Sequence, residues 1–218
     1  MLIRIFKAES ELEVWLERDG TYERFATYPI CYWSGTLGPK LREGDRQAPE
    51  GFYSVSGAQL HRHGRWPRAL DIGYPNALDR ANNRSGSAIL VHGGCSSIGC
   101  YAMTNPVMEE IFTLSEAAIA EGQDTIPIHV FPFRMTDANV AAQQAHPWSG
   151  FWANLKQAYD LFERTRRPPH VSICGTRYLV RDGTTDSAEP VTPTRMVKFA
   201  RMMQSRLPVQ PGECSRDS

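Results

Sequence analysis

The stretch GSAILVHGGCSSIGCYAMT, from Gly86 to Thr104, decides how this chain is interpreted. Its apolar run Ser87–His92 predicts a short strand that ends in a histidine. A glycine-rich turn follows, and Gly99 immediately precedes Cys100. Because His92 and Cys100 are 100 − 92 = 8 positions apart, we expect the loop to fold the imidazole back against the sulfur.

A cysteine close to a histidine is a pairing that suits nucleophilic catalysis. An ordinary thiol has a pKa of about 8.5, and a neighbouring imidazole lowers that pKa to roughly 3.5–7.5. Glycines beside the nucleophile let a carbonyl approach and free backbone N–H groups for the oxyanion. We therefore predict Cys100 as nucleophile and His92 as base, with the Gly93 carbonyl or another backbone acceptor fixing the imidazole tautomer.

Two other interpretations of these residues stay open at this point. The set His61, His63, His92, Cys95 and Cys100 could ligate zinc, although no second Cys or His pair completes a tetrahedral site. Alternatively, Cys95 and Cys100 could form a structural disulfide or stay as buried thiols. We expect neither a metal nor another cofactor.

The composition restricts the class of protein. The 218 residues carry 24 Lys and Arg against 24 Asp and Glu, and this balance argues against a nucleic-acid partner. No run of about 18 apolar residues is present, so we expect no transmembrane segment. Five cysteines are too few for a disulfide scaffold, and the odd number leaves at least one thiol unpaired.

The first third of the chain predicts an antiparallel sheet. Apolar residues alternate with mostly acidic ones over Glu11–Glu17, so we expect a strand with one buried and one wet face. Asp19-Gly20 favours a tight turn before a return strand at Tyr22–Ile30. Further strands are expected at Leu2–Phe6, Gly51–Val55, Ile126–Phe133 and Val171–Val180, with irregular loops over 35–51 and 61–84.

Helices are expected after residue 104. Asn105 is the expected cap of the first, with Pro106 as its first residue and Gly122 as its stop. An apolar stripe from Trp148 to Phe162 predicts a second helix that packs on the core. A polar linker is then expected over 182–194, followed by an amphipathic docking helix.

His92-Gly93 and the turn Ser97-x-Gly99-Cys100 form a specific pair of motifs. Together they resemble the signature of the L,D-transpeptidase (YkuD-type) catalytic domain. The segments that extend the likeness to a YafK-like branch of that family are Gly44–Tyr53, Asp71–Asn76, Val91–Thr104 and His129–Met135. The resemblance covers about residues 2–180.

The resemblance implies an α+β fold, with a mostly β YkuD-type sheet or sandwich and packed helices. It implies a catalytic domain over 1–180, followed by a linker and C-terminal docking helix over 181–218. Cys100 would be the nucleophile and His92 the base. Ser97 and Gly99 would shape the oxyanion turn, and Gly93 would supply the orienting carbonyl.

The implied substrate is a peptidoglycan stem peptide that contains diaminopimelate. Cys100 would form a thioester at the L-centre of diaminopimelate, and water would release a wall-linked lipoprotein or peptide. Many family members have Arg or Asn two residues after the cysteine, but here Cys100 is followed by Tyr101-Ala102. This difference and the short His-to-Cys spacing favour the hydrolytic branch. Candidate substrate-binding residues are Tyr74, Asn76, Arg80, Arg84 and Tyr101, with the two arginines facing a free carboxylate.

Other outcomes stay open at the level of the sequence. An amine acceptor would give 3-3 cross-links or attach a protein to the wall. A protease with the same chemistry, or a wall-binding module without activity, is also possible.

The expected location is the periplasm or cell envelope. Met1–Lys7 carries charge where a signal peptide has its apolar core, so we expect an export signal trimmed from the sequence. A secreted effector is the alternative.

Overall fold

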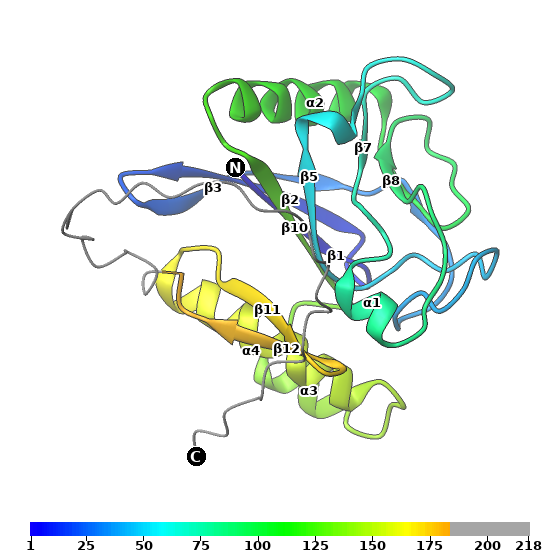
Figure 1. The fold of residues 1–218 in the computed structure, drawn as a ribbon, viewed down its shortest axis with the longest axis vertical. Coiled ribbons are helices and arrows are strands. Elements are labelled where there is room, and N and C mark those ends of the chain that lie inside the picture. Colours follow the sequence, from blue (N-terminus) through cyan, green and yellow to red (C-terminus); the bar gives the residue numbers. More distant parts are fainter. Residues whose placement is uncertain (184–218) are drawn as a thin grey trace, which may run out of the picture.

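The computed structural model describes residues 1–183, and these form two five-stranded sheets, a separate β-hairpin and four α-helices (Figure 1). The predicted α+β class, mostly β with packed helices, is confirmed. The predicted linker and docking helix lie outside the described residues. No helix within 1–183 is long and apolar enough to span a bilayer.

The first sheet has the strand order β3-β2-β1-β10-β5. Its strands are β1 (Leu2–Phe6), β2 (Glu11–Arg18), β3 (Thr21–Pro29), β5 (Gly51–Ser56) and β10 (Thr125–Phe131). β1 pairs in parallel with β10 and antiparallel with β2. All five strands were predicted, β2 from its alternation of apolar residues, with ends that differ by at most two positions.

The second sheet, of order β4-β9-β8-β7-β6, carries the motif residues on short strands. Its strands are β4 (Tyr32–Trp33), β6 (Leu60–His61), β7 (Ala69–Asp71), β8 (Leu90–His92) and β9 (Tyr101–Ala102). β8 and β9 are parallel, with Val91 opposite Tyr101 and His92 opposite Ala102. The ends of two neighbouring strands therefore flank the glycine-rich turn.

The main core lies between the two sheets. Buried apolar side chains reach it from both, such as Ile5 and Val130 from the first sheet and Val91 from the second. Helix α2 (Asn105–Ala120) adds Ile111 and Phe112, both with no exposed surface. Burial on this scale fixes β8 and β9 firmly, because a one-residue slip would turn the core side chains outward.

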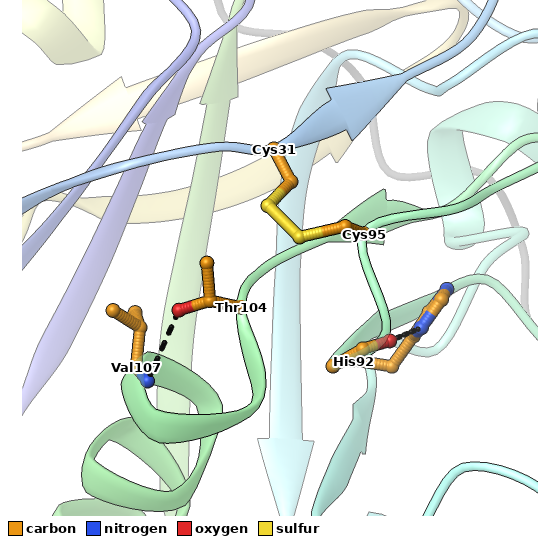
Figure 2. Close-up of a disulfide and its surroundings, with 6 residues drawn as sticks. Cys31, His92, Cys95, Thr104 and Val107 are labelled. Atoms are coloured by element: carbon orange, nitrogen blue, oxygen red, sulfur yellow. Dashed lines mark hydrogen bonds between the residues drawn. A yellow bond between two sulfur atoms is a disulfide. The ribbon is translucent and has the colours of Figure 1, made fainter.

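The N-terminal cap of helix α2 lies one position earlier in the chain than the sequence indicated. Thr104 has the extended backbone of a cap, and its Oγ1 accepts a hydrogen bond from the Val107 N–H at 3.4 Å (Figure 2). Asn105 is already helical, so its prediction as the cap was wrong. Gly122, with φ +98°, follows the helix end as expected.

The outer face of the first sheet is covered by α4 (Ser149–Thr165) and by a hairpin (Figure 1). The hairpin consists of β11 (His170–Cys174) and β12 (Arg177–Arg181), where a single strand was expected. That prediction was wrong because Gly175, with φ +58°, reverses the chain in the middle of the segment.

This cover also corrects the expected wet face of β2. Glu13 and Trp15 point to that face but are 1% and 7% exposed. The Trp15 ring meets Phe162 of α4 edge-on, and its Nε1 donates to Glu13 Oε2 at 2.8 Å. A helix packed on the second face therefore buries residues that alternation alone placed in water.

Three short helical segments were not predicted: η1 (Gly57–Gln59), α1 (Ala77–Ala81) and α3 (Asp137–Ala142). The expected irregular region 61–84 holds β7 and α1 as well as loops. Elements this short bring too few apolar residues into register to leave a periodic pattern.

Candidate active site

Cys100 lies immediately before β9, and its sulfur lies close to the backbone at the start of β8. The Leu90 N–H donates to Sγ at 3.3 Å, and Sγ lies 3.7 Å from the Ala88 carbonyl oxygen. Cys100 is partly exposed, and within residues 1–183 it is the cysteine with a free thiol. A backbone N–H directed at the sulfur stabilises a negative charge there.

The turn before Cys100 is held by two serine hydroxyls. Ser97 Oγ accepts from the Cys100 N–H at 2.7 Å and donates to the Cys100 carbonyl at 2.8 Å. The Gly99 N–H donates to Ser34 Oγ at 2.6 Å, with Gly99 at φ +101°. Sequence reasoning missed Ser34, because nothing local connects it to a turn 65 residues away.

His92 closes β8 with its ring 2% exposed. Its Nδ1 lies 2.6 Å from the Gly93 carbonyl oxygen, which can only accept, so we assign the proton to Nδ1 (Figure 2). Nε2 is then left as a proton acceptor. Burial lowers the pKa of His92 below its ordinary value, so the ring is neutral at pH 7.

The register of the sheet places the two motif side chains on one face. Because His92 is opposite Ala102, Cys100 is level with Leu90, two positions before His92. Alternate residues share a face, so the Cys100 and His92 side chains are diagonal neighbours on adjacent strands.

The expectation that His92 lowers the pKa of the Cys100 thiol is wrong for this state. Burial raises the pKa of the thiol, and the Leu90 N–H and Ser97 hydroxyl offset only part of that effect. Within the described part of the chain, no hydrogen bond joins Sγ to the imidazole. The resting site is therefore a thiol and a neutral imidazole.

Cys95 forms a disulfide with Cys31, with the Cα atoms 5.0 Å apart (Figure 2). Cys31 directly precedes β4, and Cys95 has φ +49° in the loop after His92. The bond overturns the alternative of a Cys95–Cys100 disulfide and removes Cys95 from the proposed zinc ligands. Across residues 1–183, no three His, Cys, Asp or Glu side chains gather in a way that could hold a metal ion.

Three of the five candidate substrate-binding residues are buried: Tyr74, Tyr101 and Arg84. The hydroxyls of Tyr74 and Tyr101 donate to backbone carbonyls, and both side chains are buried. Arg84 forms a buried ion pair with Asp79 at 2.9 Å. The structure thus places these three groups inside the protein.

The other two candidates line a cavity of about 470 Å³ beneath the β11–β12 hairpin. Asn76 caps α1 through Asp79 N–H, and its Nδ2 donates to the Phe52 carbonyl at 2.8 Å. Arg80 is exposed. Neither Cys100 nor His92 lines this cavity, so substrate binding by Arg80 and Asn76 stays a prediction.

Comparison with known proteins identifies the family. The family model of the L,D-transpeptidase catalytic domain (YkuD) matches residues 2–130. The chain belongs to this family. The match covers the strands of both sheets almost completely and ends within β10, so α3, α4 and the hairpin lie beyond this L,D-transpeptidase region.

A curated relative supports this assignment. "Putative L,D-transpeptidase YafK" of Escherichia coli, in strains K12 and O157:H7, is 46% identical over 82% of this chain and 72% of its own length. Among solved structures, the helical cell shape determining protein Pgp2 from Campylobacter jejuni matches 80% of this chain and 72% of its own, with 18% identity and a TM-score of 0.48. Bd1075 of Bdellovibrio bacteriovorus matches 82% and 78%, with 18% identity and a TM-score of 0.41.

Proposed function

We propose that this chain is a cysteine acyl-transfer enzyme that cleaves an amide at the L-centre of diaminopimelate in peptidoglycan. Water as the acceptor would release a wall-linked peptide or lipoprotein. Membership of the L,D-transpeptidase family supports the substrate class. The observation that carries the proposal is a free, partly exposed Cys100 thiol on the same face of β8–β9 as a neutral His92.

The groups at the site give each step a donor and an acceptor. His92 Nε2 takes the Cys100 thiol proton as Sγ attacks the carbonyl carbon, and the carbonyl electrons move to oxygen. Collapse of this intermediate breaks the C–N bond, and His92 returns the proton to the leaving amine. Water, with its proton taken by the same imidazole, then hydrolyses the thioester to a carboxylate and restores the thiol.

The hydrogen bond from His92 Nδ1 to the Gly93 carbonyl supports this role of the imidazole. It fixes the tautomer with Nε2 unprotonated, and it stabilises the imidazolium that forms after proton transfer. The carbonyl thus does for His92 what a carboxylate does in a Ser-His-Asp triad.

The Cys31–Cys95 disulfide supports a location in the periplasm or cell envelope. Disulfides persist in oxidising compartments, where peptidoglycan also lies. An amine acceptor, giving 3-3 cross-links or an attached protein, is the second candidate outcome, because the same thioester serves both reactions.

Incubation with purified sacculi tests the proposal, with mass spectrometry of the released muropeptides. We expect the wild-type protein to convert amide-linked stem peptides to free carboxylates and the Cys100→Ala variant to lose this activity completely. Ser96→Ala is the matched control, because it changes an exposed residue of the same turn and leaves Cys100 in place. Turnover by folded Cys100→Ala would contradict the assignment of the nucleophile.

The same spectra separate the alternatives. Products joined through two diaminopimelate residues would favour cross-linking over hydrolysis. Binding to sacculi with no product, and no reaction of Cys100 with iodoacetamide, would favour a wall-binding module.

A further inference from the structure

The loop between β6 and β7, residues 62–68, brings an aromatic ring onto the imidazole of the site. The Trp66 and His92 ring centroids are 4.5 Å apart, with an angle of 31° between their planes. Nδ1 of His92 is fixed at one edge by Gly93, and Trp66 covers one face of the ring. His92 is 2% exposed, although it lies at the end of a strand.

Gly94 makes this contact possible. A Cβ on Gly94 would lie 2.5 Å from Trp66 Cζ3, which is closer than two carbon atoms can approach. Gly94 also has φ +93°, a backbone conformation that favours glycine. The second glycine of the motif therefore provides space for the Trp66 ring as well as a turn.

The loop that carries Trp66 is attached to α2 by exposed ion pairs. Arg62 Nε lies 2.7 Å from Glu116 Oε1, and Arg68 Nε lies 3.0 Å from Glu109 Oε1. Exposed pairs of this kind contribute about 0–1 kcal/mol each. These pairs connect both ends of the loop to α2, and the Trp66 ring between them contacts His92.

We propose that Trp66 is a positioning residue for His92: its ring holds the imidazole against the Gly93 carbonyl and keeps water away from it. This inference rests on the proposed role of His92 as base. Rotation of the imidazole about its χ2 bond would break the Nδ1 hydrogen bond and drive the ring into Trp66. With that rotation blocked, Nε2 keeps one direction, which is what proton transfer requires.

Several charged or titratable groups act near this pair and must be considered in any titration. The Arg65 guanidinium lies 5.4 Å from the Trp66 ring centroid. Asp71 on β7 and Lys40 act electrostatically on Cys100, whose thiol shares the face of His92. Because burial is the main cause of the lowered pKa of His92, exposure of its ring is expected to outweigh these charges.

An NMR titration of the histidine side chains tests the proposal without any substrate. The His92 signal is assigned by its absence in His92→Gln. In Trp66→Ala, we expect the pKa of His92 to rise towards its ordinary value, since water then reaches the ring. Phe25→Ala is the control, because it removes an exposed aromatic ring (50% exposed) on β3 and should leave this pKa unchanged.

Kinetics on sacculi provide the second measurement. We expect Trp66→Ala to lower kcat roughly tenfold with KM within about twofold, and Trp66→Phe to recover most of the loss. An unchanged pKa of His92 in folded Trp66→Ala would overturn the positioning role. If the wild-type protein has no activity on sacculi, the proposed function fails, while the titration still decides the role of Trp66.

Discussion

At the scale of single residues, burial sets the resting state of the site. Cys100 and His92 are both neutral, because burial raises the pKa of the thiol and lowers the pKa of the imidazole. The Leu90 N–H on Sγ and the Gly93 carbonyl on Nδ1 stabilise the charged forms, which arise only when the proton moves. In the proposed reaction, proton transfer is thus coupled to attack on the substrate.

This state predicts two different dependences on pH. Alkylation of Cys100 by iodoacetamide needs the thiolate, so its rate should rise with pH through a pKa above the ordinary thiol value. Turnover of sacculi needs neutral His92, so it should fall only as pH drops below about 6.5. Stopped assays over about pH 4–10, a range that includes the ordinary pKa values of histidine and cysteine, would measure the rates of alkylation and turnover.

A rate of alkylation that is already maximal near pH 6 would contradict the neutral pair, because it would indicate a thiolate at rest. His92→Gln is the useful variant here. It should abolish turnover, and alkylation at high pH should persist.

The candidate residues differ in how well the sequence could reveal them. His92 and Cys100 lie within one short stretch, so their pairing was predicted from spacing, whereas Ser97 was predicted from the family resemblance. Ser34 and Trp66 contact the same site from separate loops, and no local pattern records such contacts. The raised pKa of Cys100 was also not predictable, because it depends on burial created by the whole fold.

At the scale of elements, the long loop between β4 and β5 is fastened by a buried cation. Lys7, which directly follows β1, donates from Nζ to three backbone carbonyls of this loop and to Glu50 Oε1 at 2.9 Å. Both side chains of the pair are fully buried. Ser34, which accepts a hydrogen bond from the Gly99 N–H, is in the same loop, so this anchor also supports the turn before Cys100.

Lys7→Met should therefore destabilise the protein strongly. It leaves Glu50 buried without its cation, and loss of one partner of a buried pair costs about 3–5 kcal/mol in the free energy of unfolding. Urea denaturation followed by circular dichroism measures this change. Lys156→Met is the control, because its pairs with Asp137 and Asp160 lie at the surface and should contribute at most about 1 kcal/mol.

Equal losses for the two lysine variants would contradict the anchoring role of Lys7. The sequence correctly indicated an irregular segment over 35–51, but a lone lysine at the end of a strand gave no sign of its four acceptors. Strands with clear alternation were predictable for the opposite reason, since their burial repeats with the period of the strand.

At the scale of the whole molecule, the Cys31–Cys95 disulfide joins the segment between β3 and β4 to the turn after β8. The two residues are 64 positions apart, so the bond closes a loop that contains β4 to β8. In the chain-entropy model, a bond of this kind restricts the unfolded chain and stabilises the fold by about 2–4 kcal/mol. The pairing could not be derived from five cysteines without the fold.

Reduction should accordingly lower stability and loosen the loop after His92. We expect a reducing agent to decrease the free energy of unfolding by about 2–4 kcal/mol, measured by urea denaturation. Cys31→Ala/Cys95→Ala should show the same decrease without any reductant. A double variant as stable as the wild-type protein would contradict the stabilising role of this bond.

The pairing of Cys95 with Cys31 also affects which disulfides Cys100, the proposed nucleophile, can form. In an oxidising compartment, a reactive thiol is exposed to mispairing with whichever sulfur is nearby in the chain. Cys95 is the neighbour best placed by sequence to trap Cys100, and its bond to Cys31 takes it out of competition. While that bond is intact, Cys95 cannot form a disulfide with Cys100.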